Sequence, residues 1–456
     1  MCASACTVGG PQHSASPKVL DGGLPPAATP SLPGHPGAYP APDPNRPRIM
    51  LRFDVSDDLR TVDGTEHVLF HPDRAIGELV FRLTANTPSS YAAGNGISIG
   101  RVSIGGHGQA SRLRRAGAAA ASPGGLLVLP LVPPVAAGAS VTADVRFTLH
   151  LGNGGFDRFG NANGISWWGS GQPLLAWERG YGWHVEPLGQ IIGETATSEA
   201  ADIDVTVVAP AAAAVFGTGH FRAARAAGGR RTWHAAAPTA RDVAVAVGKL
   251  TSRTRIVGST SVTAASYDPA ELGSMLTTED RAIGLLSARF GPFPFPSIDL
   301  ISLPERGGGI EYPGAVLLAG IGEAVLTHET AHQWFYGMVG DSQARDPWLD
   351  EAFAQYAQQL VDGTLGTGYQ DDPLPVGRSM QQWGTNVAAY FATVYGKGAA
   401  MLGAARGAAG SSKWDAAVRG YVRAEAWRIA RPGDLVRALS GLPAAVAILH
   451  AGGAVS

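Results

Sequence analysis

The sequence predicts an α+β protein in which an antiparallel β domain precedes a helix-rich domain. Residues 48–255 contain short segments that alternate apolar and polar side chains, which is the pattern of half-buried strands. After about residue 256 this pattern ends, and beyond Gly322 the chain is Ala-rich and helical in character. A length of 456 residues also fits two domains better than one core. We therefore expect a β domain at 48–255 and a second domain at 256–456.

The composition excludes several classes of protein. Hydrophobic residues make up 45% of the chain, which excludes a largely disordered polypeptide. The net charge of −2 argues against a nucleic-acid binder, which needs a basic surface to neutralise phosphates. No stretch reaches the roughly 18 consecutive apolar residues of a transmembrane helix. Both cysteines lie in the first six residues, so the rest of the chain has no thiol for a disulfide, a nucleophile or a metal ligand.

The N-terminal residues 1–47 are predicted to form a tether. Residues 7–47 contain eleven of the 32 prolines, and proline removes a backbone donor and blocks helices. Ser4 and Ala5 before Cys6 resemble the end of a bacterial lipoprotein signal, whose cysteine is acylated. We therefore expect an extracytoplasmic, bacterial protein with Cys6 as its lipid-anchor site. The charged and apolar regions that precede such a cysteine are missing, so a cytoplasmic protein is the alternative.

Residues 141–150 give the clearest strand pattern, with strict alternation over ten residues. Residues 203–207 and 243–247 repeat this pattern. The stretch 151–200 between them is expected to be a long connection, rich in the aromatic residues Trp167, Trp168, Trp177, Tyr181 and Trp183.

The second domain is expected to begin with a helix. Thr278 is a candidate N-cap for a helix that includes Ile283, Leu286 and Phe290. The alternating prolines at 292, 294 and 296 end this helix, and residues 298–303 are expected to form a strand.

Residues 328–332, with the sequence His-Glu-Thr-Ala-His, carry the most chemical information. Two histidines at positions i and i+4 lie on one face of a helix, so both imidazoles can bind one metal ion. Glu329 then projects beside the ion, where a general base can take a proton from an activated water. A surface helix with this sequence by coincidence is the alternative.

A third ligand is expected because a catalytic zinc site keeps three protein ligands and one open position. Glu351 follows His332 after eighteen intervening residues, enough for a loop at residues 346–347 and a returning helix. Asp350 competes for this role, because spacing alone does not separate neighbouring carboxylates. Glu351 could also serve only as an acidic residue at a helix N-terminus, where the dipole favours it.

Together these segments resemble the aminopeptidase N family of zinc metallopeptidases. The resemblance begins with residues 328–332 and Glu351 within the sequence Trp-Leu-Asp-Glu-Ala-Phe. Residues 308–312 (Gly-Gly-Ile-Glu-Tyr) are similar to the family's Gly-x-Met-Glu-Asn motif, and residues 395–399 (Tyr-Gly-Lys-Gly-Ala) to its Tyr-x-Lys-Gly-Ala motif. The resemblance covers about residues 48–440 and implies a saddle-like β domain followed by a thermolysin-like catalytic domain.

The resemblance implies a role for each motif residue in the hydrolysis of peptides. His328, His332 and Glu351 would bind one zinc ion. Glu329 would be the general base and then the acid for the leaving amine. Tyr395 would donate a hydrogen bond to the oxyanion of the tetrahedral intermediate.

The Gly-rich motif implies a site for the substrate's free α-ammonium, which would bind Glu311, with Gly308 and Gly309 lining the peptide. Tyr312 replaces the usual Asn, so an amide hydrogen bond there is lost or is made by the phenol. The second amine anchor of the family comes from the β domain. Glu178 is a weak candidate for it, and a simple loop carboxylate is the alternative.

We therefore expect a zinc aminopeptidase. A thermolysin-like zinc endopeptidase, in which the Glu311 segment only shapes the cleft, is the nearest alternative. A noncatalytic binding lipoprotein that retains the fold is the third. Many family members continue into a helical C-terminal domain, so a chain without it is expected to have a more open cleft.

Overall fold

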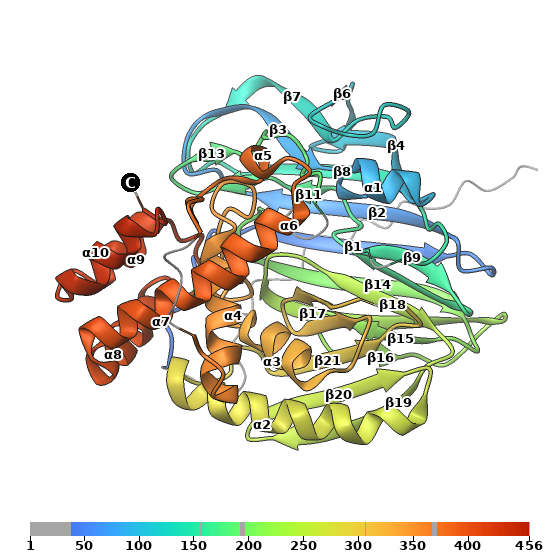
Figure 1. The fold of residues 1–456 in the computed structure, drawn as a ribbon. Coiled ribbons are helices and arrows are strands. Elements are labelled where there is room, and N and C mark those ends of the chain that lie inside the picture. Colours follow the sequence, from blue (N-terminus) through green and yellow to red (C-terminus); the bar gives the residue numbers. More distant parts are fainter. Residues whose placement is uncertain (1–37, 156, 192–196, 306, 367–371, 456) are drawn as a thin grey trace, which may run out of the picture. The chain divides into compact units, whose positions relative to one another are not determined.

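The computed structural model describes residues 38–155, 157–191, 197–305, 307–366 and 372–455 (Figure 1). Cys6 and most of the expected tether lie outside these ranges. Residues 38–47 of that stretch are packed: Tyr39 donates to the Pro292 carbonyl at 2.6 Å and contacts the Trp427 ring edge-on. None of the helices in the described ranges has the length and apolarity needed to cross a lipid bilayer.

The first domain is built around a sheet that has eight strands within the described residues, in the order β16-β17-β14-β1-β2-β8-β4-β5. Its strands are β1 (Arg48–Val55), β2 (Thr61–Phe70), β4 (Gly96–Ile104), β5 (His107–Gly108), β8 (Val141–His150), β14 (Ala201–Pro210), β16 (Arg222–Ala223) and β17 (Arg230–Ala240). β8 coincides with the strand predicted at 141–150, and its apolar positions are the buried ones. The sheet is antiparallel except that β1 pairs with β14 in parallel, which their long connection permits.

Smaller sheets complete this domain within the described ranges. They contain β15 (Ala214–Gly217), β18 (Ala244–Gly248), β10 (Ile165–Gly169) and β9 (Phe159–Ala162); β11 (Leu174–Leu175), β3 (Ile76–Arg82), β7 (Leu126–Val135) and β6 (Arg112–Arg114); and the hairpin β12 (Trp177–Glu178) and β13 (Gly182–Trp183). The short helices η1 (Thr84–Asn86) and α1 (Pro88–Ala92) lie between β3 and β4.

The prediction that residues 151–200 are only a connection is wrong, because β9 to β13 lie there. Trp167 and Trp168 are neighbours in β10, so their side chains point to opposite faces of the sheet. Trp168 packs against Phe53 in the core of the first domain. Trp167 packs in a second apolar cluster with residues of the next sheet. Strands buried on both faces lack the alternation by which the other strands were recognised.

The second domain contains a sheet with five strands in the described residues, in the order β19-β20-β21-β23-β22. Their bounds are β19 (Thr251–Val257), β20 (Thr260–Ser266), β21 (Ser297–Ser302), β22 (Gly309–Tyr312) and β23 (Ala315–Leu318). The expected domain boundary at 255/256 falls inside β19. Among the described strands, β19 pairs only with β20 of this sheet. We therefore propose a boundary in the turn between β18 and β19.

The two domains share an apolar interface. Ile165, Trp167, Ala244 and Ala246 from β10 and β18 pack against residues of β21, β22 and β23, including Ile301, Ile310, Tyr312 and Leu317. β18 is therefore buried on both faces, with its valines in the core of the first domain. This interface places β10 and β18 of the first domain next to β22.

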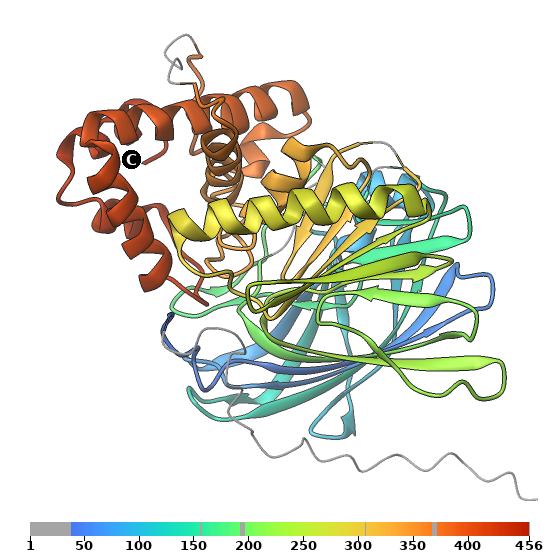
Figure 2. The same ribbon diagram turned by 90° about the horizontal axis from the view of Figure 1, so that it is seen from below.

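α2 (Leu272–Phe290) lies along the five-stranded sheet (Figure 2) and shares a core with Val262 and Ala264 of β20. The prediction that Thr278 caps this helix is wrong, because the helix begins six residues earlier. Asp268 provides the cap: its side chain accepts from the Ala270 N–H at the start of η2 (Pro269–Glu271), which leads directly into α2. Asp followed by Pro is the stronger start signal.

The remaining helices form the helix-rich part of the second domain. They are α3 (Glu323–Ala331), α4 (Trp348–Asp362), α5 (Met380–Trp383), α6 (Val387–Tyr390), the π-helix η3 (Phe391–Lys397), α7 (Gly398–Ala409), α8 (Ser411–Ala424), α9 (Pro432–Ala438) and α10 (Pro443–Ala451). The order of a β domain followed by an α-rich domain confirms the predicted fold class. α3, α4, η3 and β22 carry the candidate site residues.

Candidate active site

Two helices bring the predicted metal ligands together. His328 lies in α3, and His332 is the residue that ends this helix in helical conformation, with its N–H bonded to the His328 carbonyl at 3.3 Å. Glu351 lies in the first turn of α4. All three side chains are buried. The i, i+4 spacing and the return of the chain through the loop before α4 therefore place the three residues as predicted.

The three ligand atoms lie at the corners of a small triangle. Nε2 of His328 is 3.1 Å from Nε2 of His332 and 3.2 Å from Oε2 of Glu351, and the third side measures 3.4 Å. Tetrahedral zinc with bonds of about 2.0–2.1 Å holds its ligand atoms about 3.3 Å apart. Nδ1 of His332 is 3.0 Å from the Phe335 carbonyl, so Nδ1–H can donate there and leave Nε2 free to bind a cation. The donor set fits zinc.

Burial and charge act in opposite directions on these groups. Burial lowers the pKa of His328, which favours the neutral imidazole that binds a metal. Burial also disfavours protonation of His332, but Glu351 and Glu311 outweigh it and raise the pKa of His332 well above its ordinary value. For Glu351, the imidazoles of His332 and His328 outweigh burial and hold the pKa well below the ordinary range. The carboxylate is thus ionised, as a ligand must be.

Asp350, the competing candidate ligand, faces another way. Its Oδ1 accepts from the Glu351 N–H at 2.7 Å, and its Oδ2 accepts from Nε2 of Gln343 at 3.0 Å. Of the two clusters of potential ligand atoms found among the described residues, one contains Glu351 and neither contains Asp350. The geometry therefore favours Glu351.

Glu329 is buried beside the ligand triangle. Its Oε2 has no hydrogen-bond partner among the described residues. Burial raises the pKa of Glu329 well above its ordinary value. Its Oε1 lies close to Gly309, at the start of β22. A carboxyl group that lines the cavity and has a buried oxygen without a hydrogen-bond partner has the chemistry of a base.

Tyr395 lies in η3 and covers the ligand triangle from one side. Its ring stacks on the His328 ring, with centroids 5.6 Å apart and an angle of 11° between the planes. The Phe391 ring packs on Tyr395 at 4.7 Å. A π-helix at this position differs from the regular helix expected from the sequence, and such segments often occur at functional sites.

Glu311 lies in β22, which pairs only with β23 among the described strands and is therefore an edge strand. Its Oε1 accepts from Nε2 of Gln343 at 3.1 Å and lies 4.0 Å from the Arg158 guanidinium of the first domain. Arg158 also donates to the Tyr312 phenol at 2.7 Å. The phenol of Tyr312, which stands where the resembling motif has Asn, thus accepts a hydrogen bond from Arg158 of the first domain.

These residues line one cavity of about 420 Å³. Its walls are the edge strand, the helices α3 and α4, and η3. The lining residues are Gly308, Gly309, Ile310, Glu311, Ala324, Val325, His328, Glu329, His332, Glu351, Gln355, Gln358, Phe391 and Tyr395. Every predicted site residue of the second domain is among them. An edge strand along a cavity can pair with an extended peptide.

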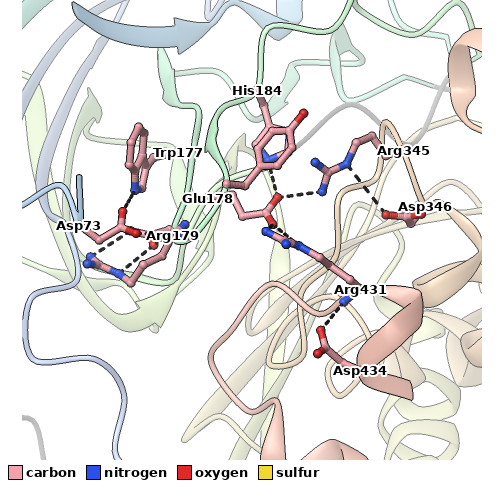
Figure 3. Close-up of polar contacts among 12 residues, drawn as sticks. Asp73, Trp177, Glu178, Arg179, His184, Arg345, Asp346, Arg431 and Asp434 are labelled. Atoms are coloured by element: carbon pink, nitrogen blue, oxygen red, sulfur yellow. Dashed lines mark hydrogen bonds and ion pairs between the residues drawn. The ribbon is translucent and has the colours of Figure 1, made fainter. Parts of the chain in front are cut away.

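Glu178, the weak candidate for a second amine anchor, lies outside this cavity lining. Figure 3 shows its carboxylate in a separate cluster with His184, Arg345 and Arg431. Oε2 accepts from Arg345 at 2.9 Å and is 2.7 Å from Nε2 of His184, and Oε1 accepts from Nε of Arg431 at 2.8 Å. Burial opposes its ionisation, but the hydrogen bonds from His184 and Arg431 outweigh it and lower the pKa of Glu178. These partners occupy the carboxylate, which argues against the anchor role.

Sequence reasoning missed Gln343 and Arg158. Gln343 lies between the two metal-ligand motifs, and a polar residue in a loop gives no signal of its own. Arg158 is far from Glu311 in the sequence, and a buried Arg is recognisable only when its carboxylate partner is known.

Part of the second domain is similar to known proteins. Residues 321–449 match the family model described as the Peptidase family M1 domain. Mouse aminopeptidase B is 32% identical over 108 residues, which is 22% of this chain and 17% of that protein. Aminopeptidase N of Plutella xylostella is 30% identical over 114 residues, or 21% of this chain and 11% of that protein. The aligned regions thus span only a small part of these relatives.

Similar solved structures cover nearly the whole chain. A variant of the M1 zinc metallopeptidase of Deinococcus radiodurans, bound to a Tyr-Ser-Ala substrate, has a TM-score of 0.66 and 18% identity, covering 91% of this chain and 96% of that chain. A two-domain M1 zinc metallopeptidase bound to L-arginine has a TM-score of 0.65 and 19% identity, with the same coverage. At these identities the likeness establishes the fold alone: a β domain followed by an α-rich domain.

Proposed function

We propose that this chain, whose residues 321–449 form a peptidase family M1 domain, is a zinc-dependent aminopeptidase that removes N-terminal residues from peptides. The observation that carries the proposal is that a candidate metal site and a candidate amine-binding carboxylate line the same cavity. His328, His332 and Glu351 form a triangle of metal-ligand atoms, and Glu311 lines the same cavity on an edge strand.

His328, His332 and Glu351 are the residues that would hold the zinc ion. When bound, zinc polarises the scissile carbonyl and lowers the pKa of a coordinated water. Two clusters of potential ligands lie in the described residues, but both contain His332. Because one imidazole cannot serve two ions here, we propose a single zinc ion.

Glu329 takes the proton of the attacking water as the water oxygen bonds to the carbonyl carbon. It then transfers this proton to the nitrogen of the leaving amine when the C–N bond breaks. Its Oε2, which has no hydrogen-bond partner among the described residues, supports this role. Tyr395, held by its stacking on His328, donates its phenol O–H to the developing oxyanion.

Glu311 sets the position of cleavage. Its carboxylate binds the free α-ammonium of the substrate, so the first peptide bond reaches the zinc ligands. The outer edge of β22, with Gly309 at its start and Gly308 just before it, pairs with the substrate backbone. Relatives named aminopeptidase, and a fold neighbour bound to a tripeptide substrate, support peptides as the substrate class.

For localisation, we propose an extracytoplasmic bacterial lipoprotein anchored at Cys6, which Ser4, Ala5 and Cys6 alone support. Metabolic labelling with a fatty acid, comparing the full chain with Cys6→Ala, tests this idea. Label that persists in the variant would contradict it.

The function is tested with a panel of aminoacyl-p-nitroanilides, each with a free and an N-acetylated amine. We expect the zinc-loaded protein to hydrolyse only the free forms. Glu329→Gln should bind zinc normally but lose about 1,000-fold in kcat, within the range for a general base.

Each other outcome points to another function. Equal hydrolysis of free and acetylated forms would contradict the role of Glu311 and favour a zinc endopeptidase. Full activity of Glu329→Gln would contradict the mechanism. No zinc and no hydrolysis would leave the noncatalytic binding protein.

A further inference from the structure

Gln343 links two carboxylates that belong to different parts of the site. It lies in the loop between α3 and α4, and its side chain is fully buried. Its Nε2 donates to Oε1 of Glu311 at 3.1 Å and to Oδ2 of Asp350 at 3.0 Å. A side-chain amide has two N–H hydrogens, so it can satisfy both acceptors at once.

Each carboxylate is connected to a group that the proposed function uses. Glu311 is the proposed amine anchor. Asp350 accepts from the backbone N–H of Glu351 at 2.7 Å, at the start of α4. The continuous chain of hydrogen bonds therefore runs from the edge strand through Gln343 to the helix that carries a metal ligand.

The contacts of Glu311 favour one orientation of its carboxylate. Gln343 and Arg158 both approach the same oxygen, Oε1, at 3.1 and 4.0 Å. Oε2 is then the oxygen that a substrate ammonium can approach. Without the amide, the nearby guanidinium would be free to draw the carboxylate toward the first domain and away from the cavity.

The loop that carries Gln343 is held from its other side. Arg345, two residues later, donates to Glu178 at 2.9 Å and lies over the Tyr181 ring, 4.0 Å from its centroid. Figure 3 shows Arg345 pointing toward Glu178. This attachment fixes the loop without touching Glu311, so the two effects can be separated by substitution.

We propose that Gln343 is a positioning residue that orients the Glu311 carboxylate to receive the α-ammonium of a peptide substrate and ties it to the start of α4. The inference rests on the proposed function. Gln343 does not contact the reacting atoms; it acts through Glu311 and therefore affects recognition of the free amine more than the chemical step.

The test compares Gln343→Leu, Gln343→Asn and Glu311→Gln with the double variant Gln343→Leu/Glu311→Gln. For a free aminoacyl-p-nitroanilide, Gln343→Leu should raise KM about 10-fold or more and change kcat less than about 3-fold, as loss of a binding interaction predicts. Gln343→Asn is too short to reach both carboxylates and should also raise KM. The double variant should show the KM of Glu311→Gln alone, because Gln343 acts through Glu311.

Arg345→Lys is the matched control. It weakens the outer attachment of the same loop and should lower the thermal unfolding midpoint with little change in KM. A KM for Gln343→Leu equal to that of the wild type would overturn the proposal. The proposal would also be overturned if the two KM effects multiplied in the double variant. A rise in KM for Arg345→Lys equal to that for Gln343→Leu would overturn it as well.

A binding measurement separates this proposal from the proposed function. Zinc-loaded Glu329→Gln is titrated calorimetrically with leucinamide and with N-acetyl-leucinamide, with and without Gln343→Leu. We expect weaker binding of the free amine only, by about 10-fold, when Gln343 is replaced. Unchanged binding would overturn the role of Gln343 whether or not the wild type hydrolyses peptides, whereas an inactive wild type would overturn the proposed function alone.

Discussion

The backbone of Gly309 lies directly against the side chain of Glu329. A Cβ atom at position 309 would overlap with Cγ of Glu329 and lie 2.7 Å from its Oε1. The edge strand can therefore approach the proposed base only because residue 309 has no side chain. The absence of a side chain at Gly309 therefore matters for the position of the proposed base as well as for the proposed peptide-binding edge.

Gly309→Ala should lower kcat/KM about 100-fold, because the new methyl group pushes Glu329 out of position and a shift of about 1 Å costs this much. Zinc content should stay normal. Steady-state kinetics and metal analysis check this. Gly407→Ala in α7 is the control, since a Cβ there meets no atom within 4 Å. Equal activity of Gly309→Ala and the wild type would contradict the proposed position of the base.

Substitution of Glu178 should destabilise the protein without changing its preference for substrates with a free amine. Glu178 joins the β12–β13 hairpin to Arg345 and Arg431 of the second domain (Figure 3). Glu178→Gln removes the carboxylate partner of Arg431 and leaves Arg345 with only the more distant Asp346, at 4.0 Å. Because both guanidinium groups are partly exposed, the free energy of unfolding should fall by about 2 kcal/mol, less than for a fully buried pair. Urea denaturation measures this. The preference for free over acetylated amines should persist, and its loss would return Glu178 to the amine site.

Because the carboxyl group of Glu279 is buried, we expect the free energy of unfolding to fall as pH rises. Burial raises the pKa of Glu279 to about 8 from an ordinary value of 4.5. Oγ1 of Thr330 lies 2.7 Å from Oε2 of Glu279 and 2.7 Å from the Leu326 carbonyl oxygen, but the hydroxyl has one hydrogen. If the hydroxyl donates to the carbonyl, a protonated Glu279 can donate to the hydroxyl oxygen. Between pH 4.5 and 8 the unfolded chain releases this proton while the folded protein keeps it. Stability contributed by the neutral carboxyl is therefore lost with increasing pH.

Glu279→Gln should remove this dependence. The free energy of unfolding of the variant, relative to that of the wild type, should rise by up to about 1.4 kcal/mol per pH unit between pH 5 and 8. Urea denaturation at each pH gives the free energies of unfolding. Asp299, whose pKa burial raises to about 7, contributes in the same direction and stays unchanged in both proteins. A constant difference between the two proteins across this range would contradict the prediction.

Removal of zinc should abolish activity and lower the thermal unfolding midpoint, because the ion binds the folded ligand triangle and not the unfolded chain. Free zinc at about 100 times Kd contributes about 2.7 kcal/mol of stability. Dialysis against a chelator, followed by zinc addition, measures both effects. His328→Ala should show no stabilisation by zinc. Full activity after complete removal of metal would contradict the zinc mechanism.

The convergence of the three candidate metal ligands was predictable because helix geometry turns sequence spacing into position. The i, i+4 rule places His328 beside His332, and the returning helix places Glu351 opposite. Strands with one exposed face, such as β8, were predictable for the same reason: alternation in sequence becomes alternation in space.

Contacts between distant segments were not predictable. Arg158 and Glu311 meet only because β10 and β18 pack on the second sheet. The sequence made Glu178 a candidate anchor because it did not show that Arg345 and Arg431 of the second domain bind its carboxylate. No local sequence pattern predicts such a contact, because it depends on how whole sheets pack.

The most direct test of the account is mass spectrometry of an unblocked decapeptide during digestion by the zinc-loaded protein. The account predicts a ladder of products that lose residues one at a time from the N-terminus, and no cleavage of the same peptide when its N-terminus is acetylated. Internal fragments from the first time point, formed equally from both peptides, would contradict it.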